Sequence, residues 1–288
     1  MRRPALGIAL LASIWGGSYL FNEIALRELG PGVIVWSRVT LGALTIWPLA
    51  ILSGATGAIR SHLKPLVLIG VVQIAIPITL ITVGQQWIAS SLAGVLNGSV
   101  PIFVALFALA IDRSERPTGM RVAGIAIGFL GVVAVYGLDV GTDRYALLGA
   151  LCLTGSSIGY AIGPLYAKTR LAGVEPLGIV AVLLTTASVA TLPLALAELP
   201  HAVPSAGAAG SVAMVGVVGT GLAFVLYYRI MQAIGPARTS VVAYLIPAVA
   251  VLYGATLLDE PVGDGIAIGL ALILLGSYLT ARRSRVPA

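Results

Sequence analysis

Two charged side chains inside long apolar stretches have the clearest chemical potential in this chain. Arg38 lies within the stretch 32–52, and Glu23 lies near the end of the stretch 5–24. A charge in hydrocarbon costs at least ~2.5 kcal/mol, so each must face a partner or water. Arg38 could bind a ligand carboxylate or form a gate with Glu23 as its counter-charge, or it could be a structural ion pair or reach the headgroups. Glu23 could instead pair with Arg27, one helical turn on, and is the candidate for proton coupling if it titrates.

Uncharged polar and aromatic residues also recur inside the apolar stretches. Trp15, Ser18, Tyr19 and Asn22 share one stripe of a helix over 5–24. Further candidates are Gln73, Thr82, Asn97, Ser99, Tyr160, Tyr227 and Tyr244. Each alone is typical of a hydrogen bond between helices, but together they predict the lining of a mostly apolar cavity with a few convergent polar groups.

Enzyme chemistry has no support in this pattern. Cys152 is the single cysteine, and both histidines, His62 and His201, fall in expected loops. Metal and acid–base chemistry need clusters of titratable residues, which the apolar stretches lack. We therefore expect no catalytic residue, no metal and no cofactor, and we expect that the protein is not an enzyme.

The composition places the chain in a membrane. It is 58% hydrophobic and 10% charged over 288 residues, whereas soluble domains carry about 25% charged residues. Apolar runs of about 20 residues predict ten spans, all of them helices because lipid offers no partner for backbone groups. The spans are 5–24, 32–52, 65–84, 91–111, 120–137, 146–167, 174–196, 208–228, 239–257 and 264–281. The first is expected to be a retained span, not a signal peptide.

The basic residues predict the orientation of these spans. Fourteen of the 17 Lys and Arg residues fall on the side of the N-terminus, two (Arg27 and Arg144) fall on the opposite side, and Arg38 is inside a span. Basic residues are retained in the cytoplasm. Both termini are therefore expected to be cytoplasmic.

An internal repeat divides the chain into two halves. Residues 70–101 align without a gap onto 216–247 with eight of 32 positions identical, and the segment GIAIG recurs at 124–128 and 265–269. The halves, 1–139 and 144–288, each hold five spans. An odd number of spans requires opposite orientations in the membrane, an arrangement typical of transporters. Pro101 and Pro247 fall at equivalent positions of the fourth and ninth spans, where each is expected to kink the helix as a fixed bend or a hinge.

Several motifs resemble the EamA family of the drug/metabolite transporter superfamily. They are SIWGGSY at 13–19, Gly30-Pro31, Arg38, IGPARTSVVAYLIP at 234–247 and LDEP at 258–261. In that family the glutamate after the ninth helix, here Glu260, is a hallmark, and Glu115 is its counterpart in the first half. Many members have lysine near the end of the first helix, where this chain has Glu23.

The resemblance implies a central cavity between helices 1–4 and 6–9, with helices 5 and 10 outside. It implies export of small metabolites by alternating access, and in size and layout the chain is most similar to the YddG-type amino-acid exporters. The expected cargo is therefore amino acids, aromatic or otherwise neutral. The alternatives are export of drugs or other metabolites, or a channel. The expected location is the plasma (inner) membrane of a prokaryote, with the lipid bilayer and a small-molecule substrate as partners and with no nucleic acid and no obligate protein partner.

Overall fold

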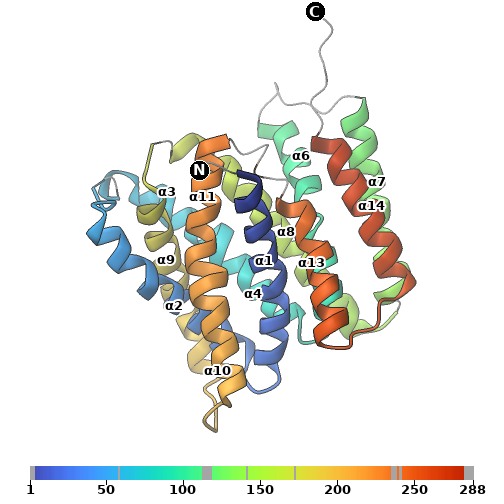
Figure 1. Cartoon of the computed structure of the whole chain (residues 1–288), viewed down its shortest axis with the longest axis horizontal. Helices are drawn as coiled ribbons and strands as arrows, with labels where there is room; N and C mark the ends of the chain where they lie inside the picture. The colour runs from blue at the N-terminus through green and yellow to red at the C-terminus, as the bar shows by residue number, and fades with distance from the viewer. Residues whose placement is uncertain are drawn as a thin grey trace, which may run out of the picture.

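The computed structural model describes residues 4–57, 59–111, 119–140, 142–171, 173–234, 239 and 242–281, and the regular elements in these ranges are helical (Figure 1). The first half comprises α1 (Pro4–Leu26), α2 (Pro31–Leu52), η1 (Arg60–His62), α3 (Leu63–Ile69), η2 (Gly70–Ala75), α4 (Ile76–Gly84), α5 (Ser90–Asn97), α6 (Val100–Ile111), α7 (Met120–Val135) and η4 (Tyr136–Val140). The second half comprises α8 (Arg144–Arg170), α9 (Pro176–Ala197), α10 (Ala206–Ala213), η5 (Met214–Leu222), α11 (Ala223–Ile234), α13 (Val242–Leu257) and α14 (Asp264–Ala281).

In the described part of the chain, six helical stretches are long and apolar enough to cross a membrane. They are Ala5–Leu26, Pro31–Leu52, Arg60–Gly84, Arg144–Ala167, Pro176–Ala197 and Ala206–Ile234. Four shorter apolar helices follow at Ser90–Val104, Val122–Leu138, Val242–Leu257 and Asp264–Gly276. Each half thus has three long stretches followed by two shorter ones, so the helix lengths repeat along the chain as the sequence does.

Local sequence explains where several helices begin. Pro31 occupies the first position of α2, where a missing N–H costs no hydrogen bond, and the extended Gly30 precedes it. Asp143 caps α8 by accepting a hydrogen bond from Tyr145 N at 3.0 Å. Ser205 caps α10 in the same way, because its hydroxyl accepts a hydrogen bond from Ala208 N at 3.2 Å. Each cap satisfies a backbone donor that the first helical turn leaves free.

The bundle has two distinct ends. α1 begins and α14 ends at the same end (Figure 1), here called the proximal end. The opposite, distal end holds the connections 27–30, 85–89, 198–205 and 258–263. Because α5 starts at the distal end, it runs antiparallel to α1 and α13.

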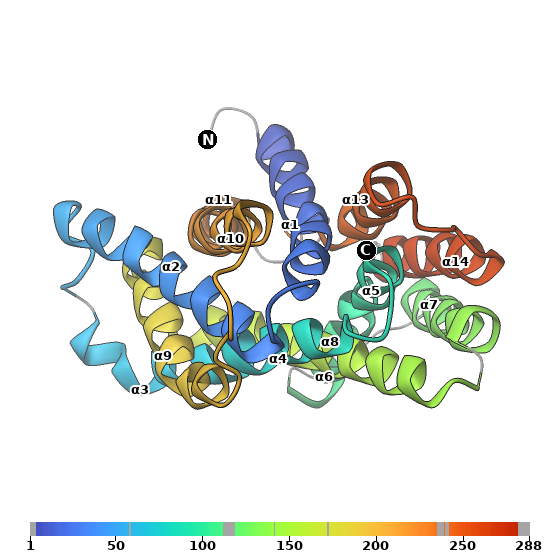
Figure 2. The same cartoon turned by 90° about the horizontal axis from the view of Figure 1, so that it is seen from below.

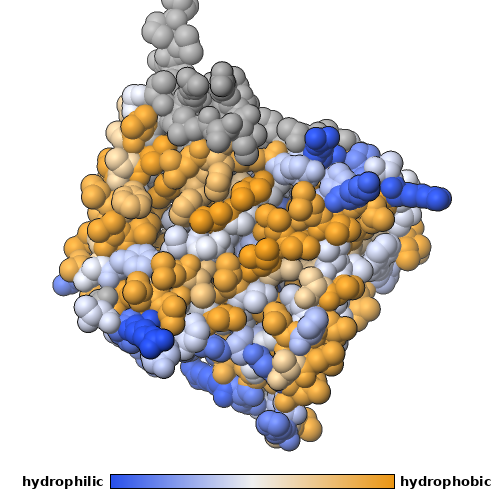
Figure 3. Space-filling view, turned by 180° about the vertical axis from the view of Figure 1, so that it is seen from behind, coloured by the Kyte–Doolittle hydropathy of each residue, from blue (hydrophilic) through white to orange (hydrophobic). Residues whose placement is uncertain are grey.

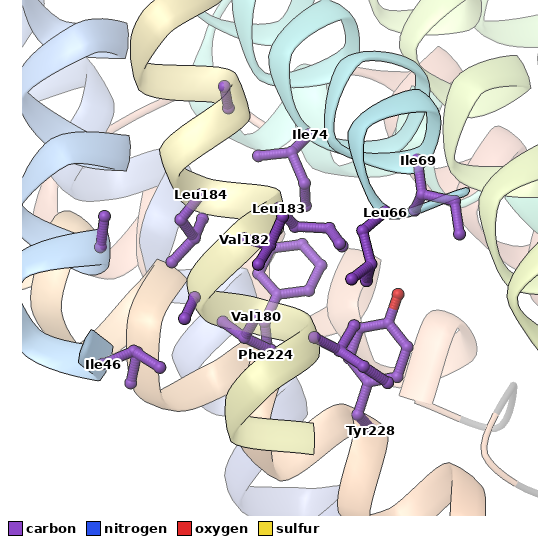
Figure 4. Close-up of a cluster of buried hydrophobic side chains, with 14 of the residues drawn as sticks. Ile46, Leu66, Ile69, Ile74, Val180, Val182, Leu183, Leu184, Phe224 and Tyr228 are labelled. Atoms are coloured by element: carbon purple, nitrogen blue, oxygen red, sulfur yellow. The ribbon is translucent and has the colours of Figure 1, made fainter. Parts of the chain in front are cut away.

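The largest core cluster lies between α2, α9, α11 and the third helical stretch. Ile46, Leu66, Ile74, Leu183 and Tyr228 are among its members (Figure 4), and each is at most 1% exposed. α2 and α9, one from each half, pack closely over this cluster. The core therefore joins the two halves across their interface.

α7 and α14 form a pair at one edge of the molecule (Figure 2). Glycines bring their backbones together: a Cβ atom at Gly131 would lie 2.9 Å from Ile273 N. Small residues permit such close approach when helices pack in lipid. This edge position agrees with the expectation that the fifth and tenth helices lie outside the others.

Large apolar side chains cover much of the exterior. Leu44, Leu52, Phe129 and Val189 are each at least 60% exposed. Figure 3 shows apolar residues across the middle of one face, with the strongly hydrophilic ones towards its margins. This distribution is the one that a lipid environment favours.

The structure differs from the expectation of one helix over 91–111. α5 ends at Asn97 and α6 begins at Val100, with a turn at Gly98 and Ser99 between them. Pro101 has no N–H to donate to the Asn97 carbonyl, and Gly98 is a poor helix former. Pro247, by contrast, lies inside the continuous helix α13.

Candidate functional site

Arg38 is a buried cation near the middle of α2. Its side chain is 5% exposed, and its Nε donates a hydrogen bond to Thr220 Oγ1 at 2.7 Å. Tyr19 and Tyr160 lie in the neighbourhood of the guanidinium. Among the residues that the structure describes, no carboxylate pairs with Arg38. The expected Glu23–Arg38 ion pair is therefore not formed.

Tyr19 belongs to a polar network that joins three helices. Asn97 of α5 donates from Nδ2 to the Tyr19 hydroxyl, and Ser157 of α8 donates to Asn97 Oδ1 at 2.9 Å. Tyr19 and Ser157 are buried. Because each member holds the next, α5 and α8 fix the position of the Tyr19 hydroxyl.

A second network lies towards the distal end. Asn22 donates from Nδ2 to Gln85 Oε1 at 2.8 Å, and Gln85 Nε2 donates to the Tyr19 carbonyl at 3.1 Å. Thr82 donates a long 3.4 Å bond to Asn22 Oδ1. All three side chains are at most 3% exposed. Asn22 and Thr82 thus connect the first and third helical stretches.

Aromatic side chains form a wall between α1 and α11. The ring centroid of Trp15 lies 5.4 Å from those of Phe224 and Tyr227, and Tyr227 lies 5.5 Å from Tyr228. The Tyr228 hydroxyl donates to Gln73 Oε1 at 3.1 Å. These contacts bring together Trp15, Gln73 and Tyr227, which are distant in sequence.

π-Helical turns at equivalent places in the two halves supply partners for the site. η2 begins at Gly70, and its repeat equivalent Gly216 lies within η5. Such turns leave backbone carbonyls available and are frequent at functional sites. In η5 the Gly219 carbonyl accepts from Trp15 Nε1 at 3.1 Å, and the Thr220 side chain holds Arg38.

Other candidate residues have more local roles. Ser18 and Ser99 donate to carbonyls of their own helical segments, Ile14 O at 3.0 Å and Leu96 O at 2.7 Å. Tyr244 is half-buried in α13. Pro101 is the second residue of α6 and Pro247 is inside α13, and both are buried.

Sequence reasoning missed several members of these networks. They are Gln85, Ser157, Thr220, Phe224 and Tyr228. Tyr228 could have been found beside Tyr227, and Thr220 by asking which groups satisfy a buried arginine. No group of three or more His, Cys, Asp or Glu residues able to hold a metal occurs in the described ranges.

Comparison with known proteins identifies the family. The EamA-like transporter family model matches residues 3–137 and again residues 147–282. The chain belongs to the EamA-like transporter family. Members of the family are transporters, so the chain is a multi-pass membrane transporter and not an enzyme.

Full-length relatives support this family membership. A Bacillus subtilis (strain 168) protein named uncharacterized transporter YoaV is 23% identical over 285 residues, which are 97% of each chain. The Escherichia coli (strain K12) protein named uncharacterized inner membrane transporter YedA is 27% identical over 289 residues, covering 92% of this chain and 89% of that protein. A crystal structure covering 97% of this chain and 96% of its own has a TM-score of 0.72 at 18% identity, which shows a shared fold.

The glutamate that the EamA resemblance singles out has a defined contact. Glu260 accepts hydrogen bonds from the backbone N–H groups of Ser90 and Ser91, each at 2.8 Å, at the start of α5. A carboxylate at a helix N-terminus satisfies free donors and complements the helix dipole. Its counterpart Glu115 lies outside the described residues.

Two more carboxylates connect the halves at the distal end. Glu198 accepts from Gly32 N at 2.6 Å near the start of α2. Glu28 accepts from Ser205 N at 2.7 Å and from the Ser205 hydroxyl. These bonds hold the pKa of Glu28 below its ordinary value. Three carboxylates of the described residues thus join the two halves at the distal end, because each bonds a residue of the other half.

Proposed function

We propose that this EamA-family transporter exports amino acids, aromatic or otherwise neutral, by alternating access around Arg38. The observation that carries the proposal is a buried guanidinium with a hydroxyl partner and no carboxylate partner among the described residues. A buried charge without a charged partner is costly, so the binding of an opposite charge to it is strongly favoured. Guanidinium matches a carboxylate through two parallel hydrogen bonds.

The surroundings of Arg38 suit the rest of an amino acid. Tyr19 and Tyr160 have hydroxyl groups in the neighbourhood of the guanidinium, and Asn97 bonds to the Tyr19 hydroxyl. Trp15 and Phe224 present aromatic faces and edges for an apolar or aromatic side chain. Together with Ser18, Asn22, Gln73, Thr82, Ser99, Tyr227 and Tyr244, these residues are the lining that we propose for the transport pathway.

We propose a topology of ten spans in two inverted five-helix repeats, approximately 1–139 and 144–288, with the proximal end and both termini in the cytoplasm. The equal order of long and short helices in the two halves supports this topology. The distribution of basic residues supports the orientation, and the name of the relative YedA supports a location in a prokaryotic inner membrane.

Cysteines placed at Ser61 and His201 in a Cys152→Ser background test the orientation. Ser61→Cys should react only with a permeant reagent and His201→Cys also with an impermeant one. The reverse pattern would refute the orientation.

The function is tested by counterflow in proteoliposomes with a panel of radiolabelled amino acids. A carrier gives saturable uptake that is accelerated by unlabelled substrate on the other side, whereas a channel gives neither. We expect decarboxylated analogues of a transported amino acid to fail as substrates. Equal transport of an amine and its parent amino acid would reject Arg38 as the carboxylate site.

The alternative of a drug exporter predicts different selectivity. A lipophilic cation would be repelled by the Arg38 guanidinium, and Glu23 lies near the distal end of α1 rather than beside this site. Transport of quaternary ammonium dyes without transport of any amino acid would favour that alternative.

A further inference from the structure

Three helices meet in register at the distal end of the molecule. A Cβ atom at Gly94 of α5 would touch Ala250 of α13 and lie 3.7 Å from Tyr19 Cδ2 of α1. Glu23, Ser90 and Gly254 are each four residues further towards the distal end, which is one turn on their own helices. They therefore lie at one level. Glu260 joins this level, because its Oε2 and the Ser90 hydroxyl both lie against the same side of Gly254.

Oxygen atoms without hydrogen-bond partners gather at this level. Glu23 Oε2 and the hydroxyls of Ser90 and Ser91 are all shielded from solvent, and none has a hydrogen-bond partner among the residues that the structure describes. Ser90 is 1% exposed and Ser91 is fully buried. Leaving a buried polar group unbonded costs about 1–3 kcal/mol, and more when it is charged. A ligand that supplies a donor here would remove part of this cost.

The charges around Glu23 indicate which ligand that is. The described charged groups that interact with it are Glu260, which repels it, and Arg27, which attracts it. α5, α10 and η5 pack against α1 without contributing a titratable side chain. The remaining titratable groups on packed elements are Tyr244 and Tyr253 of α13, Arg38 of α2, and Tyr227, Tyr228 and Arg229 of α11.

The two carboxylates are not equivalent. Both oxygens of Glu260 accept backbone N–H groups at a helix N-terminus, which stabilises its negative charge. A metal cation would be opposed by the same N–H groups and dipole. Glu23 Oε2, by contrast, accepts no hydrogen bond from the described residues. Between the two carboxylates, the proton is therefore favoured on Glu23.

We propose that Glu23 is a proton-binding site that controls the distal end of the transporter. When Glu23 is protonated, its repulsion with Glu260 disappears and the α1–α5–α13 junction is closed. When Glu23 is ionised, the two carboxylates repel each other and the junction loosens. The proposal concerns this chain's own glutamate and does not depend on which molecule is transported.

The test uses the purified full-length protein in lipid nanodiscs without substrate. Spin labels at Gln86→Cys and Val262→Cys, two exposed positions on either side of the junction, report its width in a Cys152→Ser background. We expect the distance distribution to broaden to longer values as pH rises. The Glu23→Gln variant should keep the short acidic distribution at every pH, whereas the matched control Asp264→Asn, an exposed carboxylate at the same end, should respond like the parent.

Infrared difference spectra between acid and neutral pH provide a direct readout of the proton. The parent should show a protonated carboxyl band that is lost in Glu23→Gln and retained in Asp264→Asn. The band should titrate at lower pH in Glu260→Gln, because the repulsion is removed. A band and a distance change that persist unaltered in Glu23→Gln would overturn the proposal. If Glu23→Gln does not fold, the absence of any pH-dependent carboxyl band in the parent would overturn it equally.

Discussion

The segments 70–101 and 216–247 have one backbone plan but contribute different chemistry. Both contain a π-helical turn at the same place, beginning at or just before Gly70 and Gly216. The polar contacts, however, come from positions where the repeats differ: Thr220 holds Arg38, and its counterpart is Ile74, a core residue. Shared positions such as Gly70 and Gly216 thus preserve helix geometry and close packing, whereas unmatched positions of both segments, such as Asn97 and Thr220, supply different polar groups to the candidate site.

The largest effect should come from Arg38→Ala. Truncating one partner of a buried charged pair costs about 2–5 kcal/mol, so amino-acid counterflow should fall below detection while membrane insertion is unchanged. Arg144→Ala, an exposed arginine at the distal end, is the control and should transport normally. Counterflow at the parent level in Arg38→Ala would show that this arginine has only a packing role.

Thr220→Val tests the asymmetry directly. A hydrogen bond to a charged group is worth about 1.5–3 kcal/mol, so the KM for the substrate should rise by roughly tenfold or more as Arg38 loses its orientation. Ile74→Val at the equivalent position should leave KM nearly unchanged. Equal changes in KM from the two variants would show that the repeats contribute equally.

Gly70→Ala and Gly216→Ala test the shared backbone plan. A Cβ atom would lie 2.7 Å from Thr186 Cβ at the first position and 2.9 Å from Leu41 Cβ at the second. Overpacking costs about 1–3 kcal/mol, so both variants should lower the melting temperature in detergent by similar amounts. Gly210→Ala, which meets no atom within 4 Å, is the control. If only one of the two variants lowered the melting temperature, the two glycines would not be equivalent.

The prolines should differ in effect. Pro247→Ala lets an interior position of α13 donate a backbone hydrogen bond, so α13 should straighten and the counterflow rate should change. Pro101→Ala sits in the first turn of α6, where Gly98 still interrupts the helix even if the new N–H reaches the Asn97 carbonyl, so its effect should be small. A larger rate change from Pro101→Ala than from Pro247→Ala would contradict this account.

The smallest effect should come from Glu28, an exposed carboxylate whose bonds to Ser205 lower its pKa. A lowered folded-state pKa means that its stabilisation is present above the ordinary value of 4.5 and is lost as pH falls through the folded value. The melting temperatures of the parent and Glu28→Gln should therefore differ slightly at pH 7 and converge in acid. A difference that grows in acid would contradict the assigned cap.

Much of the fold could be predicted because the physical signals are local. Apolar runs of span length set the helices, and the gapless repeat identified equivalent segments 146 residues apart. The membrane location and the family rested on the same signals. A kink at Pro101 was expected from the sequence, but the full turn at Gly98 and Ser99 was not. The π-helical turns were not foreseen, because they depend on how η2 and η5 pack against neighbouring helices.

For the site, the sequence by itself determined which polar groups are placed in an apolar chain, and Arg38 stood out because a charge there needs a partner. Only the tertiary structure decided the partners: Thr220 for Arg38, Asn97 for Tyr19, and the start of α5 for Glu260. The physical reason is that insertion cost is a property of one residue in one helix. A hydrogen-bond partner depends on the rotation and register of two helices, which are set by packing across the interface between the repeats.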